Sequence, residues 1–519
     1  MGALVLNCIL GAVRAPTTAM PAMPAEALRA ELERFLLTCS QPAILEPGQP
    51  PLILVAGQYG FTARTNGLLL EAWDESRTWA RRLVSLSPAS GGRLTVFAER
   101  LGGTRLKIVI ADLDRPVSVQ LLQRSLRENM RERFRYWLAR QYPGWQIEEL
   151  TSGADLQHTL SPSYPRALLS RGQSRVAAIA GPPETEQSGS VLTFGLIWLD
   201  YLRRREVPRP VQELAVFVQA GTEDQTLLRL KWLDPRQAAY SIFVYDEEGH
   251  ESRVDADNTG NIGSRVDRWS SGPPSVSALS VELMEALEGL AGFEAVDLGL
   301  GVVSLRIHGL AFGRLDGQQL RCGIDRLKQP RQAGQVLELA RQLAAYRCAA
   351  PPDPAHIWYR RNPEAWLESL TRRHLRTLDA ALMPTPVYGQ VPSMAGTQHG
   401  VLDLLAMEAR SRLAVLELKA SEDPNLPLQA LDYWIRVEWH ARRGEFSANG
   451  YFPGAALSED APRLLLIAPA LQFHPTTETI LRFFSPAIEV ERIGVGMEWR
   501  KDFRPVSRLR GAERPGLRI

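Results

Sequence analysis

The segment from Gly400 to Trp434 constrains the fold more than any other part of the chain. It reads GVLDLLAMEARSRLAVLELKASEDPNLPLQALDYW, two apolar stretches separated by a polar turn and followed by a helical pattern. Such a pattern predicts an antiparallel β-hairpin followed by an amphipathic helix. Asp403, Glu417 and Lys419 interrupt the two apolar stretches. Because ionised side chains are costly to bury without a partner or a ligand, these three residues are candidate site residues.

The spacing predicts where these side chains point. A hairpin that pairs Leu405 with Val415 would place Asp403 opposite Glu417 on one face. Lys419 would share that face about 7 Å along the strand from Glu417. Two carboxylates with open coordination positions suit Mg²⁺ or Mn²⁺, and a neighbouring ammonium can stabilise a phosphoryl transition state, so the spacing favours phosphodiester hydrolysis. The alternative is a purely structural Asp/Glu–Lys ion pair.

The residues GVLDLL, LAVLELK and LPLQALDYW resemble the PD-(D/E)XK nuclease superfamily, most closely its NucS-type and RecB-type branches. The resemblance covers the C-terminal part of the chain. It implies a restriction-endonuclease-like domain with a central mixed sheet flanked by helices. It also implies divalent-metal-dependent cleavage of DNA, with Asp403 and Glu417 as metal ligands and Lys419 as the catalytic lysine. The proline in the superfamily's name corresponds to Leu402 here.

The same resemblance points to four further residues. In these nucleases an upstream helix often adds a glutamate, and the segment NPEAWLESLTRRHL begins with an Asn-Pro pair that is typical of a helix N-terminus. It offers Glu364 and Glu368, of which Glu368 is the preferred third metal ligand. A solvated carboxylate favoured by the helix dipole is the alternative for both. Gln429 and Tyr433 match a Q-x-x-x-Y element that implies support of the site or contact with nucleic acid, although packing is the alternative for Tyr433.

An internal repeat organises much of the remaining chain. When Ser174 is placed on Ser411, RVAAIAG lies over RLAVLEL, and three later segments match in the same order: WLDYL with ALDYW, LAVFVQA with LLLIAPA, and TLLRL with TILRF. We therefore expect an ancient duplication, with copies at residues 117–249 and 357–498. An active copy beside a degenerate copy would form an intramolecular pseudo-dimer; the sequence leaves the oligomeric state open.

The two copies differ at the polar triad. This alignment sets three pairs of residues against each other: Asp403 on Arg166, Glu417 on Ala180, and Lys419 on Pro182. A triad needed only for folding should persist in both copies, so its loss from one copy favours a chemical role in the other. Independent divergence of two cores is the alternative. The clusters Arg203–Arg205 and Arg372–Arg373 are candidates for a path of phosphate contacts, and solvated helix ends are the alternative.

These patterns predict an α/β (α+β) chain of six segments. The predicted segments are a flexible N-terminus with one helix at Ala25–Leu37 (1–49), a small β-rich module (50–115), a degenerate nuclease-like domain (116–249), an α+β middle region (250–355), the nuclease-like domain (356–500) and a basic tail (501–519). We expect Trp73 and Trp79 to fill the core of the β-rich module, with base stacking as the alternative.

Composition limits the classes of function. The net charge of +2 provides no bulk field for a polyanion, so a surface for nucleic acid, which we expect to be DNA, would have to be local. Only five lysines accompany fifty-five arginines, which makes Lys419 an unusual choice at its position. The four cysteines lack metal-ligand spacing, which favours a reducing cytoplasm, and we expect no membrane span. A catalytically silent nucleic-acid-binding module and a protein-interaction scaffold in a repair or defence assembly remain the alternatives.

Overall fold

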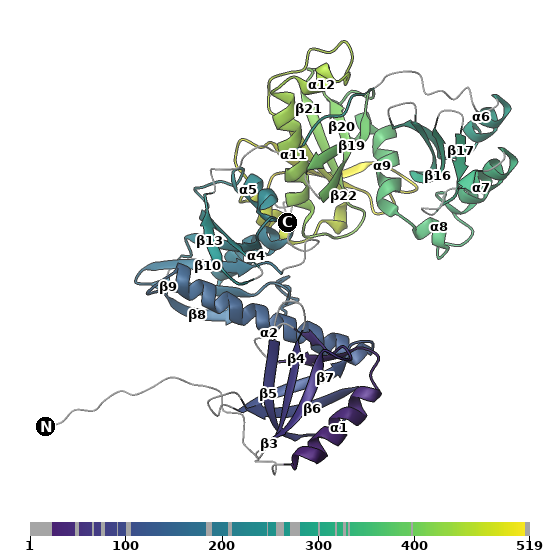
Figure 1. Cartoon of the computed structure of the whole chain (residues 1–519). Helices are drawn as coiled ribbons and strands as arrows, with labels where there is room; N and C mark the ends of the chain where they lie inside the picture. Colours follow the sequence, from purple (N-terminus) through teal and green to yellow (C-terminus); the bar gives the residue numbers. More distant parts are fainter. Residues whose placement is uncertain are drawn as a thin grey trace, which may run out of the picture. The chain divides into compact units, whose positions relative to one another are not determined.

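The computed structural model describes residues 23–46, 51–64, 67–73, 78–90, 92–99, 105–182, 189–205, 210–246, 248–255, 264–269, 281–298, 302–316, 319–324, 329–330, 333–395 and 398–513. Within these residues the chain forms four β-sheets and twelve α-helices, so its class is mixed α/β. Contacts divide the chain into two compact units, Met1–Pro143 and Gly144–Ile519 (Figure 1). Each unit has its own hydrophobic core.

The first unit is an antiparallel sheet packed against a helix. Its strand order is β2-β1-β7-β6-β5-β4-β3. The strands are β1 (Pro42–Leu45), β2 (Leu52–Ile53), β3 (Tyr59–Arg64), β4 (Gly67–Trp73), β5 (Thr78–Leu86), β6 (Arg93–Glu99) and β7 (Arg105–Asp112). Helix α1 (Ala25–Leu37) buries Leu28, Leu32 and Phe35 in the same core. The expected helix and β-rich module are present, but β1 lies in the stretch that we expected to be flexible.

The two tryptophans of this unit have different environments. Trp79 is buried, and its indole N–H donates to the Glu46 carboxylate at 2.6 Å. Trp73 is 41% exposed, so the expectation that it fills the core is wrong. It is the last residue of β4, where the strand leaves the core. Helix α2 (Pro116–Gln141) follows the sheet and ends before Pro143 as expected. It belongs to the first unit, whereas we expected it in the degenerate nuclease-like domain (116–249).

The second unit contains two sheets with the same topology. The first consists of β8 (Gln146–Thr151), β9 (Arg166–Arg171), β10 (Ser174–Ala180), β11 (Glu213–Gln219), β12 (Ala239–Tyr245) and β13 (Glu251–Val254). The second consists of β19 (Tyr388–Ala395), β20 (Gln398–Met407), β21 (Leu413–Leu418), β22 (Arg463–Pro469), β23 (Val490–Val495) and β24 (Pro505–Arg510). In both sheets the strands lie in chain order; the third, fourth and fifth strands are parallel, and all other neighbours are antiparallel.

Helices occupy equivalent connections in the two sheets. Helix α4 (Val191–Arg204) links β10 to β11, and α11 (Leu426–Ala441) links β21 to β22. Helices α5 (Glu223–Leu230) and α13 (Thr476–Leu481) fill the next connections. Parallel neighbouring strands need such crossovers. The two regions therefore share strand order, strand direction and helix placement, as an internal repeat requires.

Both repeated regions extend one strand beyond the boundaries that we expected. Strand β13 pairs with β12 and completes the first sheet, although its residues were assigned to the middle region. Strand β24 pairs with β23, so residues 505–510 belong to the second sheet and are not a tail. The side chain of Arg508 in β24 pairs with Asp379 at 3.2 Å and also contacts Glu491. The arginines of this edge strand were the reason that the sequence suggested a basic tail.

The two repeated regions pack against each other through reciprocal contacts. Helix α4 of the first region packs on α13 of the second, and α11 of the second packs on α5 of the first. One hydrophobic core continues through both regions and includes Leu230, Leu431 and Ile480. Two backbone bonds are also reciprocal: the N–H of Asp234 donates to the Phe483 carbonyl at 2.8 Å, and the N–H of Ser485 donates to the Trp232 carbonyl at 2.8 Å. Such self-complementary contacts define a pseudo-twofold axis.

The aspartate of the repeated Leu-Asp-Tyr sequence lies at this interface in both regions. Asp432 on α11 accepts two bonds from Arg229 on α5, both at 2.8 Å, and this pair is almost fully buried. Its counterpart Asp200 on α4 pairs with Arg482 at 3.5 Å, where the arginine side chain is 40% exposed. The same residue of the repeat therefore joins the two regions on both sides of the axis.

We expect Arg229→Met to lower the free energy of unfolding by about 3–5 kcal/mol, because it leaves the buried Asp432 carboxylate without a cationic partner. The matched control is Arg482→Met on the other side of the axis, where an exposed pair contributes only about 0.2–1 kcal/mol. Urea unfolding of the two variants measures the difference. Equal losses of stability in both variants would contradict this account of the interface.

A third sheet lies between the two repeated regions in the chain and has the order β14-β15-β16-β17-β18. Its elements are β14 (Phe293–Asp297), β15 (Val302–Ile307), β16 (Leu310–Asp316), β17 (Gln319–Cys322), β18 (Gln329–Pro330), α6 (Val281–Glu288) and α7 (Ala333–Tyr346). Helices α8 (Ile357–Arg360), α9 (Pro363–Arg373) and α10 (Leu375–Leu378) then lead into β19. In Figure 1, α9 lies between this sheet and the sheet of β19–β24. The Asn362 side chain caps α9 by accepting the Ala365 N–H at 3.1 Å, as expected.

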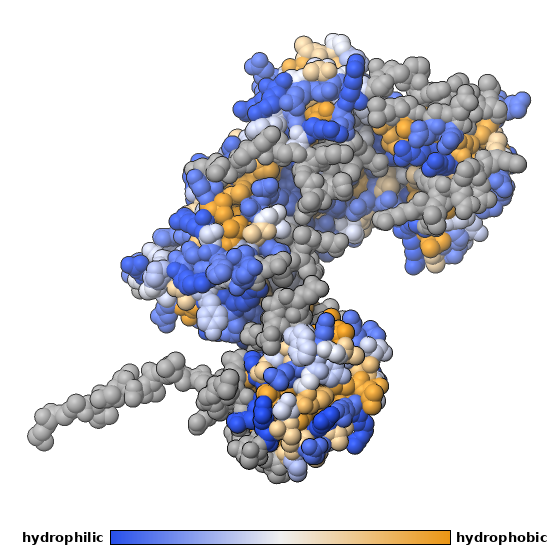
Figure 2. All heavy atoms as spheres, in the orientation of Figure 1, coloured by the Kyte–Doolittle hydropathy of each residue, from blue (hydrophilic) through white to orange (hydrophobic). Residues whose placement is uncertain are grey.

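Among the described residues, the large apolar side chains that are exposed do not come from one helix or strand. Polar and apolar residues are intermixed on the face that Figure 2 shows. The most exposed large apolar side chains belong to separate elements: Leu37, Leu156, Ile357 and Leu471. Of the helices that the structure describes, none has both the length and the apolar character needed to cross a bilayer.

Candidate functional site

The predicted hairpin forms in the expected register. Leu405 pairs with Val415, and the ladder between β20 and β21 ends at Leu404 and Leu416. The next inward N–H of β21, that of Leu418, donates to Oδ2 of Asp403 at 2.9 Å instead of to a backbone carbonyl. The Asp403 side chain thus replaces a ladder bond at the point where the ladder ends. This arrangement fixes one carboxylate oxygen at the C-terminal end of β21.

Asp403 and Glu417 face the helix α11 side of the sheet, because they share the parity of Leu405 and Val415, which lie in the core beneath α11. The intervening leucines Leu404, Leu416 and Leu418 pack in a separate core on the opposite face, as expected. Glu417 is 1% exposed. Its Oε2 atom has no hydrogen-bond partner among the described residues. A carboxylate is therefore held in the protein interior with one oxygen unpaired.

Lys419 lies between two carboxylates. Its Nζ is 3.8 Å from Oε1 of Glu417 and 3.9 Å from Oε2 of Glu364 on α9. Both distances are longer than a hydrogen bond, so the ammonium is near these groups without being bound tightly to either. The Lys419 side chain is 12% exposed, whereas that of Glu364 is 45% exposed. The cluster therefore opens to solvent on the side of Glu364.

The electrostatics of the cluster show an excess of negative charge. Enclosure of the carboxyl raises the pKa of Asp403 to about 7; the Leu418 N–H lowers it, and the nearby charge of Glu368 raises it further. Burial raises the pKa of Glu417 well above its usual value, and the charge of Asp403 adds to this effect. Lys419 opposes both shifts but does not cancel them. A further cation at this position would stabilise both ionised carboxylates.

Helix α11 brings Tyr433 to the site. Tyr433 is buried, and its pKa is raised by burial and by the charges of Glu417 and Asp403. Gln429 lies one turn earlier and is partly exposed, and among the described residues its side chain makes no hydrogen bond. Its amide is thus not committed to the fold. Tyr433 therefore packs at the site, while Gln429 remains a candidate for contact with a ligand.

The two α9 glutamates have different partners. Glu368, the preferred third ligand from the sequence, is buried, contacts Arg372 and lies 3.7 Å from Arg306 on β15. Burial raises the pKa of Glu368, and the two arginines offset this effect only in part; its charge also raises the pKa of Asp403. Glu364 contacts only Lys419 among the described charged residues. These contacts favour Glu364 over Glu368 as a third carboxylate at the site.

This difference gives a paired prediction. We expect Glu364→Gln to weaken Mn²⁺ binding about tenfold with little change in stability, because a partly exposed carboxylate near the site is lost. We expect Glu368→Gln to cost about 2–4 kcal/mol of unfolding free energy, because Arg306 and Arg372 each lose a buried carboxylate partner, with Mn²⁺ affinity largely retained. Calorimetric titration and urea unfolding of both variants provide the two measurements. The reverse pattern would identify Glu368 as the ligand.

The arginine clusters expected to line a phosphate path are engaged within the protein. Arg203 donates to the Val211 carbonyl at 2.8 Å and to the Gln237 carbonyl at 2.7 Å. Arg205 pairs with Glu149 at 2.6 Å. On α9, Arg372 and Arg373 share Glu294, and Arg373 also donates to the Phe293 carbonyl at 2.7 Å. The contacts of both clusters thus support helix ends and sheet edges, a structural role that differs from the solvated helix ends considered as the alternative.

The equivalent positions in the first repeated region differ by one residue from the sequence alignment. The parallel ladder between the third and fourth strands begins at Val176–Glu213 in the first region and at Ala414–Arg463 in the second. Five residues further along the third strand, the N–H of Gly181 and the N–H of Lys419 each donate to the fourth strand. The site residues therefore correspond as follows: Asp403 to Arg166, Glu417 to Ile179, and Lys419 to Gly181. The assignments to Ala180 and Pro182 were wrong. The turn between β20 and β21 is one residue longer than that between β9 and β10, which shifts the register after the turn.

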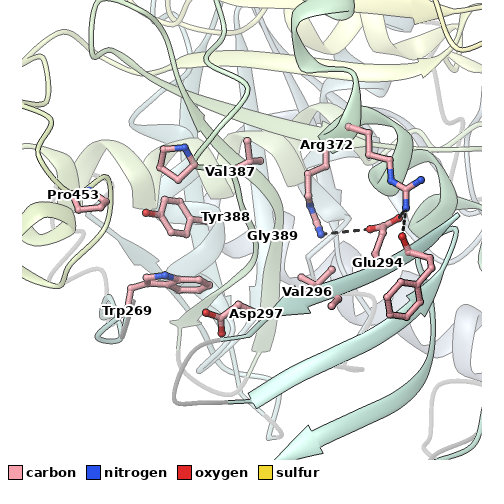
Figure 3. Close-up of a pocket in the computed structure, with 13 residues that line it drawn as sticks. Trp269, Glu294, Val296, Asp297, Arg372, Val387, Tyr388, Gly389 and Pro453 are labelled. Atoms are coloured by element: carbon pink, nitrogen blue, oxygen red, sulfur yellow. Dashed lines mark hydrogen bonds and ion pairs between the residues drawn. The ribbon is translucent and has the colours of Figure 1, made fainter. Parts of the chain in front are cut away.

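A cleft of about 570 Å³ is lined by residues of β14, α9 and β19 (Figure 3). Trp269, Tyr388 and Pro453 form one side, and Arg372 with Glu294 lies on the other. Gly389 in its lining is next to Glu368, because a Cβ at this glycine would lie 3.1 Å from the Glu368 carboxylate. The lining does not include Asp403 or Glu417. The chemical centre is therefore the carboxylate cluster, and the cleft is a neighbouring feature.

The residues fit a hard divalent cation held by few protein ligands. Across the described ranges, no three His, Cys, Asp or Glu side chains are grouped as a complete metal cage. Mg²⁺ is often bound by only one or two carboxylates, with water and substrate oxygens completing its shell. The unpaired Oε2 of Glu417 and the raised pKa of Asp403 are the features that such an ion would satisfy. Asp403 and Glu417 are thus the residues that would hold it.

Neither the protein-family models nor the curated protein sequences gave a match to this chain. The geometry and electrostatics of the carboxylate cluster therefore carry the functional inference. Sequence reasoning had identified Asp403, Glu417, Lys419 and Tyr433, which the fold brings together. It missed Arg229, which holds α11 at its Asp432; the repeated Leu-Asp-Tyr sequence was the available signal.

Proposed function

We propose that the chain is a divalent-metal-dependent nuclease that hydrolyses phosphodiester bonds, with DNA as the substrate expected from the PD-(D/E)XK resemblance. The proposal includes a restriction-endonuclease-like assignment of the sheet β19–β24 and its helices. The observation that carries it is the buried Glu417 carboxylate, which interacts with Asp403 and Lys419 and has one oxygen, Oε2, without a hydrogen-bond partner among the described residues. A buried carboxylate oxygen without a hydrogen-bond partner is costly, and a bound cation at this position would remove that cost.

Each residue has a defined role in this proposal. Asp403 and Glu417 hold the cation, and the Leu418 N–H keeps Asp403 in position. When bound, such an ion polarises a phosphoryl oxygen and supplies a nucleophilic water at neutral pH. The Lys419 ammonium stabilises negative charge that develops on the phosphoryl group, and Glu364 keeps the ammonium near Glu417. Gln429 is free to contact the nucleic-acid backbone, and Tyr433 closes the site on the α11 side.

The first repeated region supports a chemical role for the cluster. It has the same strand order with Arg166, Ile179 and Gly181 at the equivalent positions. The scaffold can thus form without any of the three polar residues. Their presence in one region alone is therefore explained better by chemistry than by folding.

Incubation of the protein with labelled single-stranded and double-stranded DNA tests the proposal. We expect cleavage with Mg²⁺ or Mn²⁺, none with EDTA, and none in Asp403→Asn under any condition. Asp502→Asn is the matched control, because the Asp502 side chain is 61% exposed and pairs only with Arg504 among the described residues. Cleavage by Asp403→Asn at the wild-type rate would exclude this site as the source of activity.

A further inference from the structure

We propose that the chain is a single-chain pseudo-dimer that takes double-stranded DNA across its pseudo-twofold axis and cuts only one of the two strands. This inference rests on the proposed nuclease function and adds a substrate class and a product. It follows from three features of the second unit: the reciprocal interface, the symmetry that this interface creates, and the unequal residues at the two equivalent positions.

The two repeated regions pair through one self-complementary interface. Its centre is the buried pair of Arg229 and Asp432, to which Gln225 adds a bond at 2.6 Å, and a continuous apolar core surrounds it. On the reciprocal side Asp200 pairs with Arg482 at 3.5 Å, and Arg204 donates to the Thr479 hydroxyl at 3.2 Å. A self-complementary surface that is filled within one chain is closed to a second copy of that chain. One chain therefore brings one complete pair of domains to a substrate.

The pseudo-twofold axis favours a duplex as the ligand. The two backbones of double-stranded DNA are related by twofold axes, and twofold protein assemblies match this symmetry when they bind it. A duplex centred on the axis meets equivalent surfaces of both regions, one for each strand. A single strand has no such axis and would meet only one region in a given orientation. The symmetry of the two regions therefore matches a duplex and does not match a single strand.

Only one of the two equivalent positions can perform the hydrolysis. Arg166 takes the place of Asp403, and it is 4% exposed. Its guanidinium donates to the Gly153 carbonyl at 2.7 Å and to the Ser161 carbonyl at 3.4 Å, and it lies 5.4 Å from the ring centre of Trp198. A buried cation therefore stands where the other region has a carboxylate, and Ile179 replaces Glu417. This region can contact a strand but cannot hold the metal that cleavage of that strand requires.

Supercoiled plasmid DNA distinguishes the products of one and two cuts. We expect open circles to accumulate first, with linear DNA forming at least about tenfold more slowly, because a second cut needs an independent binding event. Linear DNA that appears as fast as open circles would overturn the inference, as would faster cleavage of a single-stranded circle of the same sequence. Wild-type protein that cuts no substrate would instead contradict the proposed function.

Sedimentation equilibrium with a short duplex tests the pseudo-dimer without relying on cleavage. The protein used is Lys419→Met, with Ca²⁺ as the divalent ion. We expect one chain bound to each duplex, and a single species of one chain in the absence of DNA. Two chains on each duplex, or a dimer of the free protein, would overturn the inference. An absence of duplex binding would overturn it as well.

Discussion

Replacement of Lys419 by methionine is expected to lower kcat for DNA cleavage by about 10²- to 10³-fold, the typical loss when one transition-state stabilising group is removed. Methionine retains the length of the aliphatic stem, so packing beside Glu417 is preserved. The ammonium lies 3.8 Å from Glu417 without a hydrogen bond, so the fold does not depend on it. Single-turnover rates measured on a labelled duplex give the effect on the chemical step.

The same variant separates catalysis from metal binding. Loss of a positive charge near Asp403 and Glu417 should leave Mn²⁺ affinity unchanged or raise it slightly, because the ammonium opposes a second cation. Lys501→Met is the matched control, because the Lys501 side chain is 56% exposed and pairs with Glu498 at 3.1 Å. A tenfold loss of Mn²⁺ affinity in Lys419→Met would show that Lys419 acts on the metal and not on the phosphoryl group.

The second large effect is expected at Arg347, which lies just after α7 and is fully buried. Its guanidinium donates to four backbone carbonyls that surround the start of α9: His308 at 3.1 Å, Trp358 at 3.0 Å, Arg361 at 2.6 Å and Asn362 at 3.0 Å. It also lies 4.8 Å from the ring centre of Trp366. Burial, together with the charge of Arg500, lowers its pKa to about 9. A buried cation thus holds the helix that carries Glu364.

We expect Arg347→Ala to lower the free energy of unfolding by about 3–5 kcal/mol, because several buried carbonyls lose their donor and a cavity remains. Removal of the desolvated charge offsets only part of this loss. The exposed Arg341 on α7 is the matched control, and Arg341→Ala should change stability by less than about 0.5 kcal/mol. Urea unfolding of the two variants gives the comparison. Equal stability of both would show that the four bonds contribute little net energy.

Local pattern was sufficient to predict much of the fold. The period of the apolar residues predicted α1, α2 and the hairpin of β20 and β21, because each of these elements is determined by neighbours in the sequence. The Asn-Pro start of α9 was equally clear, since a cap needs only a few adjacent residues. The site hairpin was therefore predicted in its register, and with it the common face of Asp403 and Glu417.

Features that depend on distant residues were not predictable in this way. One example is the contact of Glu368 with Arg306, which comes from a strand about sixty residues earlier, because no pattern in α9 indicates that contact. Trp73 looked like a core residue, but the end of β4 leaves the sheet core. Arg508 of β24 resembled part of a tail because its partner Asp379 lies before the sheet begins. For Glu368 and Arg508 the deciding interaction joins segments far apart in the chain.

Calorimetric titration of Mn²⁺ into the wild-type protein and into Glu417→Gln tests the central claim most directly. We expect one site per chain in the wild type and none in the variant. Unfolding in EDTA should show Glu417→Gln to be as stable as the wild type, or up to about 2 kcal/mol more stable, because glutamine removes a buried unpaired carboxylate. Equal Mn²⁺ binding by both proteins, or a loss of about 3–5 kcal/mol in the variant as expected for a broken structural ion pair, would contradict the claim.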